Sequence, residues 1–201
     1  MDDPEARKEL SGLIIISIAT VAIIAVIIIA GAMLFRSNLT FNYRAVEAIF
    51  PVYEEGQLSQ TRADIIKVVE QEYLSPRNAL EYSDGIDEPW CADFVSWIYN
   101  SAGHKFKNPA SGGWRIPGTN TLKEYFESEN RWHDKDSGSI PEPGDVIIYN
   151  GGIFGSHTNI VISVYYDEIT TVGGNENGKI MMHRVDYNDN RYGILGYGSA
   201  E

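Results

Sequence analysis

The chain has 201 residues, which leaves room for one sizeable domain and additional segments. It carries 28 acidic and 16 basic residues, a formal net charge of −12, which is the opposite of the balance that a nucleic-acid partner requires. Its single cysteine excludes an intrachain disulfide and leaves one thiol for an intermolecular bridge or for chemistry.

An uncharged run of 23 residues, Leu13–Phe35, is the first feature of the chain. At about 1.5 Å per residue it reaches roughly 35 Å, which predicts a membrane span. We expect an uncleaved signal anchor, with a cleaved signal peptide as the alternative because Ala30-Gly31-Ala32 resembles a cleavage site. The flanking basic residues barely decide the orientation. We place the N-terminus in the cytoplasm because the function inferred below belongs outside it.

The predicted organisation is a short tail (1–12), the transmembrane anchor (13–35), a stalk (36–60) and one domain (61–201). The first half of the domain predicts helices. Apolar residues recur at helical spacing after Thr61 and again after Cys91. The expected helices are Thr61–Leu74, a helix that begins near Cys91 and stops at Gly103, and Thr121–Ser128.

The second half of the domain, from Pro143 onward, has the short apolar runs and turn residues that are typical of strands. Helices followed by a run of strands indicate an α+β fold, with the helices packed on one face of a mostly antiparallel sheet. The five expected strands are Val146–Tyr149, Thr158–Tyr166, Glu168–Val172, Lys179–Tyr187 and Ile194–Tyr197.

Cys91 lies at the start of a predicted helix, just after Pro89 and Trp90. Proline suits a first helical turn, and the free N–H groups and the dipole at such an end favour a thiolate. The alternative is a small buried apolar residue, which is what most free cysteines are.

A cysteine nucleophile needs a base and a group that orients the base. Of the four histidines, His104 and His133 are expected at the surface and His183 in a packing role inside a strand. His157 opens an apolar strand beside a loop, so its ring can be rigid and still face a cleft. If this strand and the next form a hairpin, Asn175 at the end of the second lies opposite His157.

Four segments in order resemble a CHAP domain, a cysteine, histidine-dependent amidohydrolase/peptidase related to the papain-like NlpC-type cell-wall hydrolases. They are Pro89–Trp97, Pro143–Tyr149, Ser156-His157 and Ile169–Asn175. The resemblance implies a papain-like fold and cleavage of amide bonds in bacterial peptidoglycan through a thioester. It also implies Cys91 as nucleophile, His157 as base and Asn175 as the residue that orients the base.

One position departs from the family pattern. Many members have Glu-Gly-Asn where this chain has Gly173-Gly174-Asn175. The acid that helps to hold the histidine in relatives falls on Gly173. Asn175 therefore acts alone here, or another acid takes that place.

Weaker features leave alternatives open. Acidic residues between Asp84 and Glu88 would suit calcium, but their spacing matches no clean calcium loop, so neither a metal nor another cofactor is predicted. Trp114 and Trp132 could stack on sugar rings, although such residues more often belong to a core. The expected partners are peptidoglycan, the membrane through residues 13–35 and an envelope-spanning complex. The rival functions are a catalytically silent wall-binding module that tethers a membrane complex, and a cysteine hydrolase acting on another substrate.

Overall fold

The computed structural model describes residues 50–201. The predicted tail, the predicted anchor 13–35 and the stalk up to residue 49 lie outside the described residues. Within residues 50–201, none of the helices has the length and apolar character that a bilayer crossing requires. The described part is α+β, as the sequence predicted.

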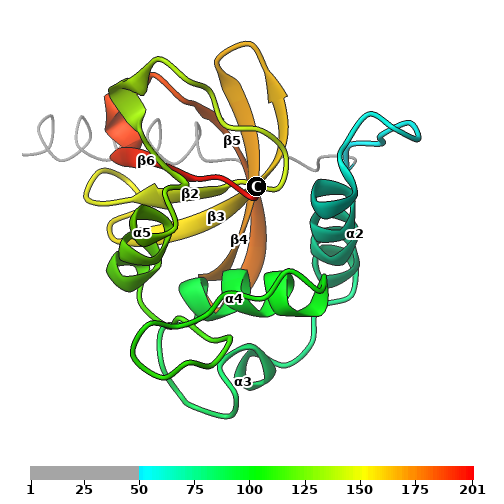
Figure 1. The fold of residues 1–201 in the computed structure, drawn as a ribbon, viewed down its shortest axis with the longest axis vertical. Helices are drawn as coiled ribbons and strands as arrows, with labels where there is room; N and C mark the ends of the chain where they lie inside the picture. Colours follow the sequence, from blue (N-terminus) through cyan, green and yellow to red (C-terminus); the bar gives the residue numbers. More distant parts are fainter. Residues whose placement is uncertain (1–49) are drawn as a thin grey trace, which may run out of the picture. The chain divides into compact units, whose positions relative to one another are not determined.

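The helices occupy the first half of the described chain (Figure 1). Ser59 caps the first of them by accepting a hydrogen bond from the Arg62 backbone N–H, which satisfies one of the free donors at that end. The helices are α2 (Gln60–Leu74), α3 (Ala79–Tyr82), α4 (Cys91–Ser101) and α5 (Thr119–Ser128), with short 3₁₀ helices at Lys135–Ser137 and Asn190–Tyr192.

The sheet has six antiparallel strands rather than the five expected. The extra strand, β1, is three residues long and pairs only with β6, so it is too short to show an alternating pattern in the sequence. In spatial order the strands are β1 (Trp132–Asp134), β6 (Ile194–Gly198), β2 (Val146–Tyr149), β3 (His157–Tyr165), β4 (Glu168–Glu176) and β5 (Lys179–Asp186). The β4 strand extends to Glu176, four residues beyond its expected end.

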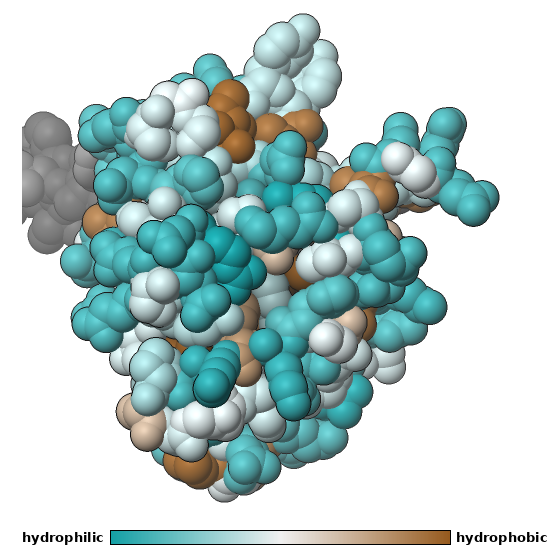
Figure 2. All heavy atoms as spheres, viewed as in Figure 1, coloured by the Kyte–Doolittle hydropathy of each residue, from teal (hydrophilic) through white to brown (hydrophobic). Residues whose placement is uncertain are grey.

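Apolar residues are buried on both faces of the sheet. Alternate residues of a strand point to opposite sides, so one strand contributes to both clusters. In β2, Val146 and Ile148 join the core beneath the helices, while Ile147 and Tyr149 join a second apolar cluster on the other face. Helix α4 packs against β3 and β4, with α2 and α5 on either side of it (Figure 1). The face of the molecule seen in Figure 2 is mostly hydrophilic, as expected when the apolar residues fill these cores.

The motif Pro143-Gly144-Asp145 has a structural role. Asp145 is 1% exposed, and its carboxylate accepts hydrogen bonds from Arg62 at 2.8 Å and from the backbone N–H of Ala200 at 2.9 Å. Burial raises the pKa of Asp145, and the Arg62 guanidinium offsets part of that rise. This buried pair fixes α2 and the C-terminal residues to the turn that precedes β2.

Residues 50–58, which we expected in the stalk, contact the domain. Phe50 is 7% exposed, and its ring lies 6.2 Å from that of Tyr73 in α2. The Tyr53 hydroxyl donates a hydrogen bond to the Ile162 carbonyl in β3. The packed unit therefore includes side chains that precede residue 61.

Candidate active site

Cys91 is the first residue of α4 and is 8% exposed. The residue before it, Trp90, occupies the N-cap position and provides no side-chain hydrogen bond to the helix. The backbone N–H groups of a first turn have no partners within the helix, so at this end they remain available to an oxygen that carries negative charge. The sequence prediction for the local structure around Cys91 is confirmed.

His157 is the first residue of β3 and is 7% exposed. The residue before it, Ser156, shares a 2.7 Å hydrogen bond with Thr119 at the start of α5, which fixes the entry of the strand. The Phe154 ring stacks on the imidazole with a centroid separation of 5.8 Å and an interplanar angle of 15°. The Cys91 thiol lies close enough to the imidazole to help raise its pKa, so the structure brings together the two residues predicted as base and nucleophile.

The second ring nitrogen of His157 faces Glu176. Nε2 lies 3.3 Å from Glu176 Oε1, while the other carboxylate oxygen, Oε2, bonds Nε2 of His183. The Glu176 and His183 side chains are 10% and 5% exposed. The result is a buried chain of contacts from Cys91 through His157 and Glu176 to His183.

Asn175, the expected partner of His157, does not make this contact. Within the described residues its side chain forms no hydrogen bond to the ring, and Glu176 stands in its place. The pairing of β3 with β4 aligns Ile160 with Val172, and a regular continuation would set Asn175 opposite His157.

The ladder is not regular at this end of β4. The pairing of β4 with β5 shifts between Gly173 and Glu176, and Asn175 adopts a left-handed conformation with φ of 62°. A bulge of this kind redirects the side chains that follow it. Asparagine tolerates the left-handed region better than most residues, so Asn175 supports the bulge that turns Glu176 towards His157.

Gly173, where many relatives have the acid, has no room for a side chain. A Cβ atom there would lie 1.9 Å from Asn159 Oδ1 and 2.9 Å from Glu176 Oε1. Gly174 is equally constrained, since its Cβ would lie 2.5 Å from the Trp90 ring. Position 173 therefore cannot hold an acid, and the acid that faces His157 in this structure is Glu176.

The pKa shifts of His157 and Glu176 favour opposite charges on these two side chains. Burial lowers the pKa of His157, but hydrogen bonds and charge attraction from Cys91 and Glu176 outweigh it and raise that pKa to about 9. Burial raises the pKa of Glu176, and the hydrogen bonds from His157 and His183 more than offset this, so the net shift is downward. The raised pKa of His157 and the lowered pKa of Glu176 favour an imidazolium beside a carboxylate at neutral pH.

Sequence reasoning missed Glu176 and His183. The sequence analysis predicts no role for Glu176, and it expects His183 to pack inside a strand. The available signal was the acid itself, one residue beyond the expected orienting residue. Only the bulge in β4 decides which of the two neighbours faces the ring.

A second polar cluster fixes the loop before α5 to the start of α4. Asp93 is fully buried, and one of its oxygens accepts a 2.7 Å hydrogen bond from Arg115, which also pairs with Glu88. Burial raises the pKa of Asp93, with Arg115 acting against that rise. The other oxygen of Asp93 is buried without a partner. Across residues 50–201, no group of three or more histidine, cysteine, aspartate or glutamate side chains is arranged to hold a metal ion.

A cysteine at a helix start, close to a histidine that an acid contacts in turn, is the arrangement expected of a cysteine-dependent hydrolase. Comparison with protein families agrees: residues 82–175 match the family model described as the CHAP domain. This match to the CHAP domain, the cysteine- and histidine-dependent amidohydrolase/peptidase family, agrees with the resemblance seen in the sequence. The matched region includes Cys91, His157 and Asn175 and ends one residue before Glu176.

Two solved structures resemble the chain at low identity. One is the crystal structure of Ly7917 with the hydrolyzing product of MDP, at 16% identity, a TM-score of 0.45 and coverage of 69% of this chain. The other is the crystal structure of Ly7917, at 14% identity, a TM-score of 0.46 and coverage of 71%. The aligned region spans 62% of each of those chains. No curated protein matches the sequence significantly.

Proposed function

We propose that this protein is a membrane-anchored hydrolase that cleaves amide bonds in peptidoglycan outside the cytoplasm. The main support for the proposal is the contact of Cys91 with His157, together with the hydrogen bond between the His157 ring and Glu176. The CHAP match supports the amide chemistry. The uncharged run 13–35 supports the anchor, and the order of helices and strands supports a papain-like arrangement.

In the proposed first half of the reaction, Cys91 attacks the carbonyl carbon of the scissile amide after its proton has passed to His157. The carbonyl π electrons move to the oxygen, and this oxyanion accepts hydrogen bonds from first-turn N–H groups of α4. His157 then returns its proton to the amide nitrogen as the carbon–nitrogen bond breaks. An amine leaves, and the acyl group remains on the sulfur as a thioester.

In the second half, water takes the place of the departed amine. His157 accepts a proton from the water as its oxygen attacks the thioester carbonyl. The carbon–sulfur bond breaks, a carboxylic acid leaves, and the thiolate–imidazolium pair is restored. Glu176 acts throughout by holding the ring with Nε2 towards the carboxylate, which directs Nδ1 to the sulfur.

Digestion of purified cell wall tests the proposal. Full-length protein should release new carboxyl and amino ends that mass spectrometry can assign to a bond. Cys91→Ala should abolish this release, and His157→Ala should nearly abolish it, because the members of such a unit are strongly non-additive. Cleavage of wall by the Cys91→Ala protein at the normal rate would exclude the mechanism.

The rival function, a silent wall-binding module, predicts a different result. In that case Cys91→Ala leaves every measurable property intact, including binding to wall, and no new ends appear with the unchanged protein. The buried chain from Cys91 to His183 favours the enzyme, because a binding module has no need of a histidine whose pKa is raised to about 9 beside a thiol.

A further inference from the structure

A cavity of about 440 Å³ lies beside the C-terminal half of α4, away from the residues assigned to catalysis. Asn100 of the helix forms one wall, and the loop that carries Lys105, Lys107 and Trp114 forms the rest. Asn100 follows Cys91 by nine residues, which is about 13 Å along the helix axis.

In the part of the chain that the structure describes, four polar side chains around this cavity have no side-chain partner. Within residues 50–201, the ammonium groups of Lys105 and Lys107, the indole N–H of Trp114 and the carboxamide of Asn100 make no side-chain hydrogen bond or ion pair. All four side chains can donate hydrogen bonds, so they match a ligand rich in oxygen acceptors.

The two lysines are unusual in this acidic chain. Most other basic side chains in the described part are engaged, as Arg62 is with Asp145 and Lys123 is with Glu127. Among residues 50–201, the lysines without a side-chain partner are Lys67, Lys105, Lys107 and Lys179, and two of these four line the same cavity. Two unneutralised cations in one hollow favour an anionic ligand.

The Trp114 ring favours a sugar among the anionic ligands. Trp114 is only partly buried, and an indole face beside hydrogen-bond donors is suited to the C–H face of a sugar. Asn108 holds the loop in shape: its side chain donates to the Arg115 carbonyl at 2.7 Å and accepts from the Ala110 backbone N–H at 2.8 Å. The cavity therefore lies between α4 and a loop whose conformation is fixed by the hydrogen bonds of Asn108.

We propose that this cavity binds an acidic saccharide, a sugar ring that carries a carboxylate or phosphate, with Trp114 under the ring and Lys105 and Lys107 at the charge. The neighbour of Trp114, Arg115, pairs with Asp93 in the first turn of α4, so the cavity and the helix that carries Cys91 are joined by direct contacts. The site goes beyond the proposed hydrolysis, because it binds a group remote from the bond that Cys91 attacks.

The test is a binding titration of the full-length protein carrying Cys91→Ala, which prevents turnover and makes binding independent of the hydrolysis proposal. The probes are N-acetylmuramic acid and N-acetylglucosamine, which share a sugar ring and differ by the lactyl carboxylate. Saturation-transfer NMR and tryptophan fluorescence report on the contact. We expect the acidic sugar to bind roughly fivefold or more tightly than the neutral one, and added salt to reduce this difference.

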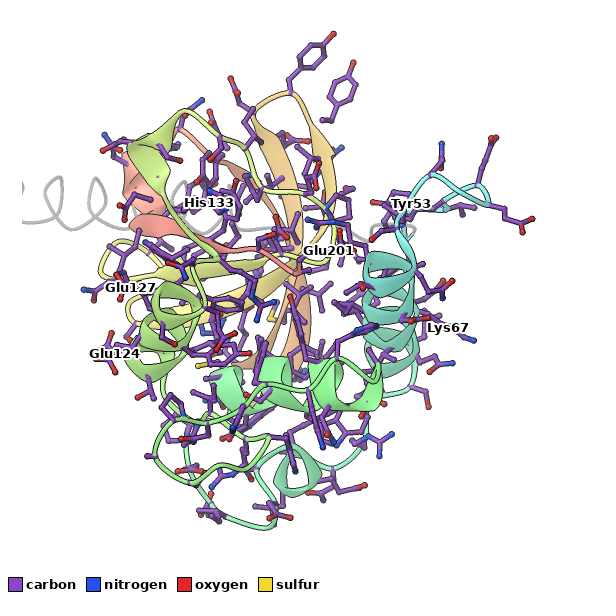
Figure 3. All side chains as sticks on the ribbon, viewed as in Figure 1. Tyr53, Lys67, Glu124, Glu127, His133 and Glu201 are labelled. Atoms are coloured by element: carbon purple, nitrogen blue, oxygen red, sulfur yellow. The ribbon has the colours of Figure 1, made fainter. Side chains whose placement is uncertain are left out.

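Two pairs of substitutions supply the matched comparison. The double variant Lys105→Gln with Lys107→Gln should lose the preference for the acidic sugar. The double variant Lys67→Gln with Lys179→Gln removes the same charge from exposed positions that do not share a cavity, and it should retain the preference. Figure 3 shows Lys67 pointing away from the body of the domain on α2.

Each further outcome bears on the proposal. Equal losses in the two double variants would mean that overall charge, and not this cavity, attracts the sugar. Inorganic phosphate binding as tightly as the acidic sugar, with no effect of Trp114→Phe, would overturn the saccharide assignment. Loss of hydrolysis in Cys91→Ala without loss of sugar binding is the result expected if both proposals hold. If the unchanged enzyme hydrolyses wall but neither sugar binds, the saccharide site is excluded and the proposed hydrolysis stands.

Discussion

The sharpest test of the site replaces Glu176 with glutamine. Glu176→Gln keeps the size of the side chain and removes the charge that both His157 and His183 face. A hydrogen bond to a charged group contributes about 1.5–3 kcal/mol, and each 1.4 kcal/mol is a factor of ten in rate. Loss of this contact in the transition state therefore predicts a fall in kcat/KM of roughly 10- to 100-fold.

The pH profile supplies a second readout of the same variant. The imidazolium that protonates the leaving amine persists to about pH 9 in the unchanged protein, because the contacts of His157 raise its pKa to about 9. The rate of amide cleavage, which depends on the imidazolium, should fall as the pH rises through about 9. In Glu176→Gln the carboxylate that helps to raise the pKa of His157 is gone, so this alkaline limb should move to lower pH. Wall digestion and the rate of Cys91 labelling by iodoacetamide, both followed from pH 5 to 10, measure the shift.

The matched control is Asn175→Gly, because glycine adopts the left-handed conformation of that residue without strain. If Glu176 orients His157, Asn175→Gly retains most of the activity while Glu176→Gln loses it. A reversed order, with Glu176→Gln fully active at an unchanged pH optimum and Asn175→Gly inactive, would falsify the assignment of Glu176. The family-based role of Asn175 would then stand.

Three other outcomes are expected. Gly173→Ala should lower the free energy of unfolding by about 1–3 kcal/mol in urea denaturation and reduce activity, because its Cβ would overlap Asn159 Oδ1; an unchanged midpoint would contradict the packing described here. Arg62→Met should lower the free energy of unfolding by roughly 3–5 kcal/mol, because it leaves the buried Asp145 carboxylate without Arg62. A decrease below about 1 kcal/mol would show that the pair is not desolvated. The full-length chain should stay with membranes after carbonate washing, and external protease should reach the domain on intact cells; a soluble full-length chain would exclude the anchor at residues 13–35.

The stability of the site has its own pH dependence, which follows from the direction of the Glu176 shift. The pKa of Glu176 is lower in the folded protein than its usual value of 4.5, so its contacts stabilise the fold above about pH 4.5 and this contribution is lost as the pH falls through the folded pKa. The stability difference between the unchanged protein and Glu176→Gln should therefore narrow on acidification. Thermal unfolding of both proteins at pH 3.5, 5 and 7 measures it, and a difference that grows at low pH would contradict the pairing.

The sequence by itself determined the local features of this protein. Helical spacing of apolar residues after Cys91 placed the thiol at a helix start, and the alternating runs after Pro143 placed five of the six strands. These predictions succeed because apolar periodicity and turn residues report on structure within a few residues of each other. The contact of Cys91 with His157 followed from that local picture together with the order of the family motifs.

The tertiary structure decided which polar residue supports the histidine. A regular β3–β4 ladder puts Asn175 opposite His157, and the sequence contains no direct sign that the ladder breaks. At the bulge, Gly173 approaches Asn159 and Gly174 approaches Trp90 too closely for a side chain, and both contacts join residues that are separated in the sequence. Because a shift of one position in a strand reverses the direction of every following side chain, these remote contacts give the role to Glu176.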